Sequence, residues 1–238
     1  MVGSSSDGNC YVLRSVGGES LVLELGVPWH AVKRALGFSL RGLAGCAVSH
    51  RHGDHALCVA DALRSGVAVC APPDVFGGLP PSPLAVAARH RRGLRMGGFS
   101  LLPLSVEHDA PCVAYVVSHA EMGALLFVTD TMAFRYRVSG LRHVMIEANY
   151  SDEALGEAVA AGVTPAGARA RIVGSHMEIG TTLATLAATD LSRAREVVLL
   201  HLSSRNSDAA GFKARVEAAT GLPAYVAEAG LRLDLSCV

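Results

Sequence analysis

Three histidines and one aspartate fall within the six residues His50-Arg51-His52-Gly53-Asp54-His55, directly after the apolar run Leu43–Val48. Imidazole and carboxylate groups are the ligands that zinc and neighbouring divalent metals prefer. A packed core gains nothing from this cluster, because four polar groups buried together each need a partner. A solvated histidine-rich loop is the alternative, but the strand pattern before the cluster and the helical spacing after it fix the geometry of the loop. We therefore interpret the cluster as a metal loop, with its first two histidines directed to one ion and its Asp-His pair to a second.

Length and composition are consistent with one large α/β domain spanning residues 1–238, half of which are apolar. The 21 basic and 21 acidic residues balance. This balance argues against an overall electrostatic attraction to nucleic acid, although it does not exclude a local basic patch. Aromatic residues make up only 5% of the chain, so the sequence shows no obvious stacking platform for single strands.

The six cysteines form no CxxC pair, and most lie in apolar runs; they are Cys10, Cys46, Cys58, Cys70, Cys112 and Cys237. The first residues lack the charged-then-apolar pattern of a secretory signal. We therefore expect buried free thiols in a reducing, cytoplasmic compartment rather than disulfides. No run of about 18 apolar residues occurs, so we expect no membrane span.

Apolar periodicity predicts strands and helices in alternation along the chain. A β-hairpin is predicted at 10–25, and further extended segments at 43–49, 67–71, 99–106, 112–118, 124–129, 144–147, 171–174, 196–200, 224–227 and 231–235. Helices are predicted at 28–36, 55–64, 152–161, 181–188 and 209–220. Two sheets packed face to face with helices outside would satisfy this order.

Residues 72–98 differ from their surroundings, because they are rich in proline and carry the basic run Arg89-His90-Arg91-Arg92. We expect a surface excursion here and not a second domain. The basic run is interpreted as a solvated face, with a patch for phosphates as the alternative.

Further ligand-capable side chains follow three later strands. Glu107-His108-Asp109 comes after Leu101–Val106, Asp130 after the strand ending at Thr129, and His201 after the strand ending at Leu200. A sandwich places an open site at such strand ends. A single strand-end histidine is usually only a partly exposed side chain, but three such positions together with the cluster favour a metal site.

The six-residue cluster matches the HxHxDH signature of the metallo-β-lactamase superfamily, and the resemblance covers nearly the whole chain. Several shorter segments resemble the branch that contains the tRNA 3′-processing endonuclease and small bacterial and phage DNA exonucleases. These are Gly3-Ser4-Ser5-Ser6-Asp7-Gly8-Asn9-Cys10, Thr129-Asp130-Thr131, Ile146-Glu147-Ala148-Asn149-Tyr150, Ser175-His176-Met177 and Leu200-His201-Leu202-Ser203. The resemblance implies a four-layer αβ/βα sandwich, the metallo-β-lactamase fold.

The resemblance also implies a binuclear centre. It places His50, His52 and His108 on the first ion, places Asp54, His55 and His201 on the second, and makes Asp130 the bridge. Zinc suits the histidine-rich ligand set, with manganese or iron as alternatives. Two dications lower the pKa of a bridging water, so that hydroxide is available near neutral pH.

Two further roles follow from the resemblance. Asp54 would also orient the nucleophile, and His176, oriented by Glu147, would contact the scissile phosphate or protonate the leaving oxygen. A purely structural His176 is the alternative. One departure from the family affects the site, because Glu24 stands where the family usually has Asp, and the longer carboxylate alters the hydrogen bonds that support the ligands.

The sequence therefore predicts a metal-dependent hydrolase, most consistent with a phosphodiesterase or nuclease acting on nucleic acid or a small phosphodiester. A hydrolase of a small thioester, lactone or cyclic nucleotide is the first alternative. A non-catalytic metal-binding member of the fold is the second. The chain lacks room for the long inserted domain of the larger RNA-cleaving members, which weakens a role in tRNA processing. Oligomerisation is left open.

Overall fold

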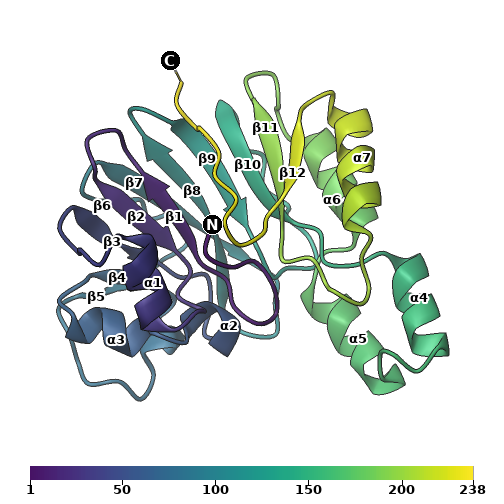
Figure 1. Ribbon diagram of the computed structural model, residues 1–238, viewed down its shortest axis with the longest axis horizontal. Helices are drawn as coiled ribbons and strands as arrows, with labels where there is room; N and C mark the ends of the chain where they lie inside the picture. Colours follow the sequence, from purple (N-terminus) through teal and green to yellow (C-terminus); the bar gives the residue numbers. More distant parts are fainter. Residues whose placement is uncertain (238) are drawn as a thin grey trace.

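Two β-sheets lie between two layers of helices in the computed structural model, which describes residues 1–237 (Figure 1). The first sheet has the order β1 (Tyr11–Arg14), β2 (Ser20–Leu23), β3 (Leu43–Ala47), β4 (Val69–Ala71) and β5 (Ala85–Ala87). The second has the order β12 (Ala224–Val226), β11 (Glu196–Leu200), β10 (Leu141–Glu147), β9 (Gly123–Val128), β8 (Cys112–His119), β7 (Phe99–Val106) and β6 (Leu94–Met96).

The helices flank the two sheets or extend from their ends. They are α1 (Trp29–Ala35), α2 (Gly53–Ala56), α3 (Val59–Arg64), the short 3-10 helix η1 (Pro73–Phe76), α4 (Asp152–Ala160), α5 (Ala166–Ser175), α6 (Ile179–Ala188) and α7 (Ala209–Thr220). Figure 1 shows α6 and α7 beside β11 and β12, whereas α4 and α5 form a pair that extends away from the sheets. The order of layers is the αβ/βα sandwich that the sequence predicted.

Three apolar cores hold the layers together. Tyr11 and Phe127 are among the side chains that meet between the two sheets, with their rings edge to face and 5.6 Å apart. Ile146 packs with Phe212 between the second sheet and its helices. Val32 belongs to the core between the first sheet and α1. Burying these large side chains is the main force that favours the stacked arrangement.

Strand direction brings the loops of the candidate site to one end of the sandwich. β2 to β5 are mutually parallel, as are β9 to β12. β7 is antiparallel to β8, and β8 to β9, so β7 runs in the same direction as β9. The ends of β3, β7, β9 and β11, which the sequence linked to metal ligands, are therefore all carboxyl ends.

Most predicted elements are confirmed, including the hairpin of β1 with β2, but two are wrong. Residues 171–174, predicted as extended, belong to helix α5. Residues 231–235, predicted as a strand, pair with no strand among residues 1–237; their Leu233 and Leu235 instead pack against the core between the sheets. The predicted helix at 55–64 is divided into α2 and α3.

The segment 72–98 is more than a surface excursion. It contains η1 and supplies β5 and β6, which are the edge strands of the first and second sheets respectively. The segment therefore crosses from one sheet to the other. Pairing of β5 and β6 with the neighbouring strands holds this proline-rich segment in place.

The cysteines agree with the predicted free thiols. All six are unpaired, and five of them are buried, which raises the pKa of Cys10 well above its ordinary value and that of Cys58 to about 12. Within residues 1–237, no helix is both long and apolar enough to cross a lipid bilayer.

Candidate metal centre

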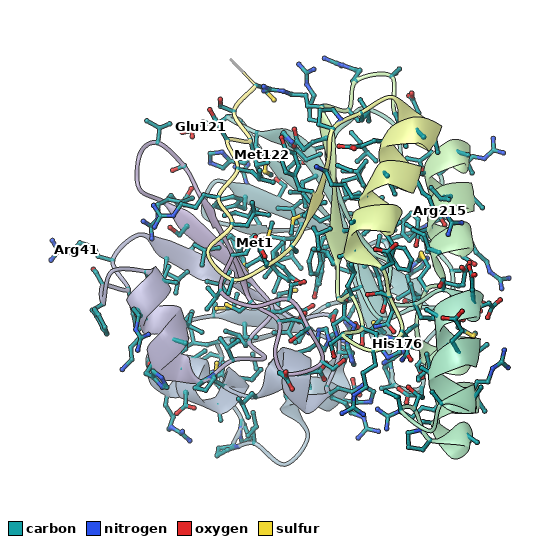
Figure 2. All side chains as sticks on the ribbon, turned by 45° about the vertical axis from the view of Figure 1, so that its right-hand side comes forward. Met1, Arg41, Glu121, Met122, His176 and Arg215 are labelled. Carbon is teal, nitrogen blue, oxygen red and sulfur yellow. The ribbon has the colours of Figure 1, made fainter. Side chains whose placement is uncertain are left out.

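The predicted ligands converge where the strands end. The cluster at 50–55 follows β3 and enters α2, while His108, Asp130 and His201 follow β7, β9 and β11. Asp130 and His201 have positive φ angles of 46° and 54°, which non-glycine residues seldom adopt. Such strained residues persist only where the surrounding structure holds them, and they gather at functional sites. Figure 2 labels His176 at this same end of the molecule.

The first ligand group consists of His50, His52 and His108, each of which offers one nitrogen within 4.8 Å of the others. The ring of His108 is oriented because its Nδ1–H donates to the carbonyl of Ser175 at 3.0 Å. Its Nε2 then lies 3.2 Å from Nδ1 of His52. Nδ1 of His50 is hydrogen-bonded to the hydroxyl of Ser49 at 2.9 Å, which leaves Nε2 directed at the group.

The second ligand group consists of Asp54, His55, Asp130 and His201. Nε2 of His55 lies 3.3 Å from Oδ2 of Asp54 and 3.3 Å from Oδ1 of Asp130. Nε2 of His201 lies 3.2 Å from the same Asp54 oxygen. The two carboxylates and two imidazoles therefore face a common point.

Asp130 connects the two groups. Its Oδ1 faces the second group, and its Oδ2 lies 3.9 Å from Nε2 of His50 in the first. The hydroxyl of Thr129 donates to Oδ1 at 2.6 Å and fixes the carboxylate. One carboxylate thus offers an oxygen to each ligand group, which is the arrangement that a bridging ligand requires.

The donor set fits divalent metal ions. Nε2 of His50 and Nδ1 of His55 are buried and have no hydrogen-bond partner among residues 1–237. Leaving buried polar atoms unpaired is costly, and a metal ion would satisfy the unpaired Nε2 of His50. Nδ1 of His55 instead faces Glu24 at 3.5 Å, as expected for a ligand whose second nitrogen contacts a carboxylate.

Burial and neighbouring charge shift the pKa values of the ligands in opposite directions. Burial, followed by the charge of His55, lowers the pKa of His50 to about 2. Burial opposes protonation of His201 as well, but the carboxylates of Asp130, Asp54 and Glu147 outweigh it and raise the pKa of His201 to about 10. The carboxylate-rich second group therefore attracts positive charge strongly.

Glu24, the departure from the family pattern, supports the centre from the end of β2. It has a positive φ of 64°, and its carboxylate accepts the backbone N–H of Ser49 at 3.2 Å. The longer side chain still reaches His55, as described above. The substitution of Glu for Asp therefore preserves a carboxylate contact to a ligand histidine.

His176 and Glu147 form a pair beside the ligand groups. Nδ1 of His176 lies 2.7 Å from Oε1 of Glu147 and 3.8 Å from Oδ2 of Asp130. The backbone N–H groups of Thr131 and Met177 donate to the other oxygen of Glu147 at 3.1 and 3.3 Å. Glu147 is thus fixed in place, and it raises the pKa of His176 against the effect of burial. The two residues also share ligand spacing with Asp130 and His201.

Several supporting residues contact the ligand groups in ways that the sequence did not predict. Oδ1 of Asp109 lies 3.2 Å from Nε2 of His52 and 3.1 Å from Nε2 of His108, so it contacts two histidines of the first ligand group. Asn149 donates to the carbonyl of His201 at 2.7 Å, and Asn9 donates to the carbonyl of Asp54 at 3.2 Å. Both asparagines lie in segments that resemble the nuclease branch, but no sequence signal shows which atom each one contacts.

Comparison with known proteins agrees with this architecture. No protein-family model matches the chain, and no curated protein sequence matches it. Among solved structures, the metallo-β-lactamase fold protein YhfI from Bacillus subtilis has a TM-score of 0.72 at 14% identity, with 98% of this chain and 97% of that chain covered. Igni18, described as a metallo hydrolase from the archaeon Ignicoccus hospitalis, has a TM-score of 0.63 at 14% identity, with coverage of 98% and 97%.

Human tRNase Z, short form, is also similar, with a TM-score of 0.60 at 13% identity over 98% of this chain and 97% of that chain. At these identities the similarity establishes architecture and leaves the reaction open. The chain has the metallo-β-lactamase fold, as the sequence resemblance implied.

Proposed function

We propose that this protein is a binuclear metal-dependent hydrolase that cleaves phosphodiester bonds. In this proposal the first ion is held by His50, His52 and His108, the second by Asp54, His55 and His201, and Asp130 serves both. The observation that carries the proposal is the Asp130 carboxylate, which presents one oxygen to each ligand group. When bound, two divalent ions supply positive charge that activates water and stabilises charge on the phosphoryl oxygens. Zinc suits the histidine-rich set, and manganese or iron would also fit.

The protein side chains have distinct tasks in this proposal. Asp54 accepts contacts from His55 and His201 through the same oxygen, so its other oxygen is available to orient the attacking water. His176 is held through Nδ1 by Glu147, so Nε2 is the nitrogen available to a substrate. The raised pKa of His176 favours the protonated ring, which suits a group that donates a proton to the leaving oxygen.

A phosphodiester is the bond that we favour among those the fold can accommodate. His176 and Glu147 support it, since hydrolysis of a diester needs a proton donor for the alkoxide that departs. The compared structures include human tRNase Z, an enzyme whose name specifies an RNA substrate. A small thioester or lactone is the competing bond class, which is separated by assay. A cyclic nucleotide is the alternative substrate whose bond is itself a phosphodiester.

A panel of substrates and metals tests the proposal. Metal-free protein is loaded with zinc, manganese or iron and is assayed on bis(p-nitrophenyl) phosphate, a thioester and a β-lactam. We expect hydrolysis of the diester above the other two, and its loss in His50→Ala. His30→Ala is the matched control, because His30 is exposed on α1. Preferential hydrolysis of the thioester or lactam, or no hydrolysis of any diester, would overturn the proposal.

A further inference from the structure

Two loops cover the part of β7 that leads to the metal centre. In the first, residues 89–92, the N–H of Arg91 donates to the carbonyl of Pro103 at 2.8 Å, and Nδ1 of His90 accepts the N–H of Ser105 at 3.1 Å. In the second, residues 131–140, the hydroxyl of Tyr136 donates to the carbonyl of the same Ser105. Both loops are therefore attached to β7 near its carboxyl end.

This position is close to the ligand groups. His108 follows Ser105 by three residues, or about 10 Å of extended chain. The second loop begins directly after Asp130. Both loops are thus anchored to segments that carry proposed metal ligands.

The two loops concentrate positive charge in a chain whose net charge is zero. Together they contain Arg89, Arg91, Arg92, Arg135 and Arg137, all exposed, and no acidic residue. Arg135 pairs with Glu107 at 3.2 Å. The other four arginines have no ion-pair partner among residues 1–237. A local excess of unpaired guanidinium groups attracts anions even when the whole protein is neutral.

The arginines are also ordered by the loops. Arg91 has a positive φ of 56°, which is uncommon for a residue with a side chain, and its hydrogen bond to Pro103 holds it there. Its guanidinium lies 5.9 Å from the centre of the Tyr136 ring. The Tyr136 ring also packs against the rings of His90 and Phe134, with centroids 5.6 and 5.4 Å away, so it holds Arg91 in a defined position.

We propose that these five arginines and Tyr136, here called the arginine platform, bind the strand of a single-stranded nucleic acid next to its cleavage point. This inference rests on the proposed function and specifies its substrate class. Guanidinium groups bind phosphate oxygens in a bidentate manner. Unpaired bases stack on aromatic and guanidinium planes, and paired bases in a duplex do not expose their faces in this way.

Fluorescence anisotropy of labelled twelve-nucleotide strands tests the platform. The test variant is Arg91→Gln/Arg137→Gln, and the control is Arg41→Gln/Arg215→Gln. Both variants remove two exposed arginines that have no ion pair among residues 1–237. Figure 2 shows the two control residues at opposite edges of the molecule. In this binding assay every metal-loaded protein, including the wild-type reference, also carries His176→Ala, which should slow cleavage while both ions are retained, and gels confirm that the strands stay intact.

We expect the test variant to bind DNA and RNA strands roughly tenfold more weakly than wild type at low salt. We expect its log-log salt slope to be smaller by about 1.4, since two phosphate contacts are lost. The control should bind like wild type. The DNA and RNA arms show which strand is preferred, and a twelve-base-pair duplex should respond less to the test substitutions.

Equal binding by the test and control variants, or an equal loss on duplex and single strand, would overturn the arginine platform. Hydrolysis of bis(p-nitrophenyl) phosphate separates this failure from failure of the proposed function. That small diester does not extend to the two loops, so the test variant should cleave it at the wild-type rate. If the wild type cleaves the small diester but strand binding does not depend on Arg91 and Arg137, the proposed hydrolase function stands and the arginine platform is contradicted. If the wild type cleaves no diester, the proposed function itself is contradicted.

Discussion

At the scale of single residues, the candidate centre depends on how each histidine is oriented. An imidazole has two nitrogens, and the partner of one determines which is left for a metal ion. Ser175 occupies Nδ1 of His108, and Ser49 occupies Nδ1 of His50, so in both rings Nε2 faces the site. His52 has the opposite orientation, because Asp109 contacts its Nε2.

Asp109 should therefore matter, because its Oδ1 lies 3.2 Å from Nε2 of His52 and 3.1 Å from Nε2 of His108. Asp109→Asn removes the charge that holds Nε2–H of His52, and we expect affinity for the first ion to fall by about 10–100-fold. Competition with a chromophoric chelator measures this change. Asp61→Asn is the matched control, since the two side chains are 46% and 43% exposed. Equal affinities in the two variants would show that Asp109 does not orient His52.

Substitution of His176 should lower the turnover rate without changing the number of metal ions bound. We expect His176→Ala to lower the rate of hydrolysis of a dinucleotide by about 10²–10⁴-fold, because it removes the proton donor for the departing alkoxide, while both ions are retained. Hydrolysis of bis(p-nitrophenyl) phosphate should change much less, because p-nitrophenolate leaves without a proton. Glu147→Gln should lower the rate by a smaller factor and shift the basic limb of the pH–rate profile to lower pH, since the Glu147 carboxylate raises the pKa of His176. Metal analysis of the purified variants checks the distinction. Loss of an ion from His176→Ala would make His176 a ligand instead.

At the scale of elements, helix α5 connects the pair that extends from the sheets to the metal centre. Its last residue, Ser175, supplies the carbonyl that orients His108, and His176 follows directly. Disturbing this helix should therefore alter two site residues at once, although most of α5 is exposed.

Proline substitutions in α5 test this coupling. Ala170→Pro lies in the helix interior and should destabilise it by about 3 kcal/mol, so we expect both metal affinity and turnover to fall. Ala166→Pro is the control, because the first helical position tolerates proline and the preceding Pro165 already has ψ of 135°. Chelator competition and diester hydrolysis are measured for both. Unchanged metal affinity and activity in Ala170→Pro would show that α5 does not position the site residues.

The elements also show what sequence can predict and why. Strands such as β9 and β11 are continuous apolar runs because both of their faces are buried, and such runs are easily recognised. Helix α5 was not predicted, for two reasons. Gly167 and Gly174 lower the helix propensity of the segment, and its largely exposed surface gives little apolar periodicity. The HxHxDH spacing and the later strand-end residues predicted which side chains the fold brings within ligand distance of one another. The contacts of Asp109 and Asn149 depend on loops that meet only after folding, and no local pattern encodes them.

At the scale of the whole molecule, the sandwich collects negative charge at one end of its strands. In the metal-free protein this charge is balanced by protons, because the neighbouring carboxylates raise the pKa of His201 to about 10 and that of His55 well above its usual range. Both rings are thus protonated at neutral pH and must lose their protons to bind a metal ion.

Metal uptake should therefore release protons and strengthen with pH. Because the raised pKa values keep His201 protonated below about pH 10, affinity should rise by about tenfold per pH unit for each proton released across pH 6–8. Calorimetry in buffers of different ionisation enthalpy counts these protons directly. A binding enthalpy that is independent of the buffer would contradict the release of protons from His201 and His55.

The central claim is that two ions act together through Asp130, and a zinc titration of metal-free protein tests it most directly. The rate of bis(p-nitrophenyl) phosphate hydrolysis is followed as zinc is added in fractions of an equivalent. We predict that the rate rises until two ions are bound per chain and then stays constant, and that Asp130→Asn gives little activity at any loading. A rate that reaches its maximum at one ion per chain, or no hydrolysis at any loading, would contradict the binuclear mechanism.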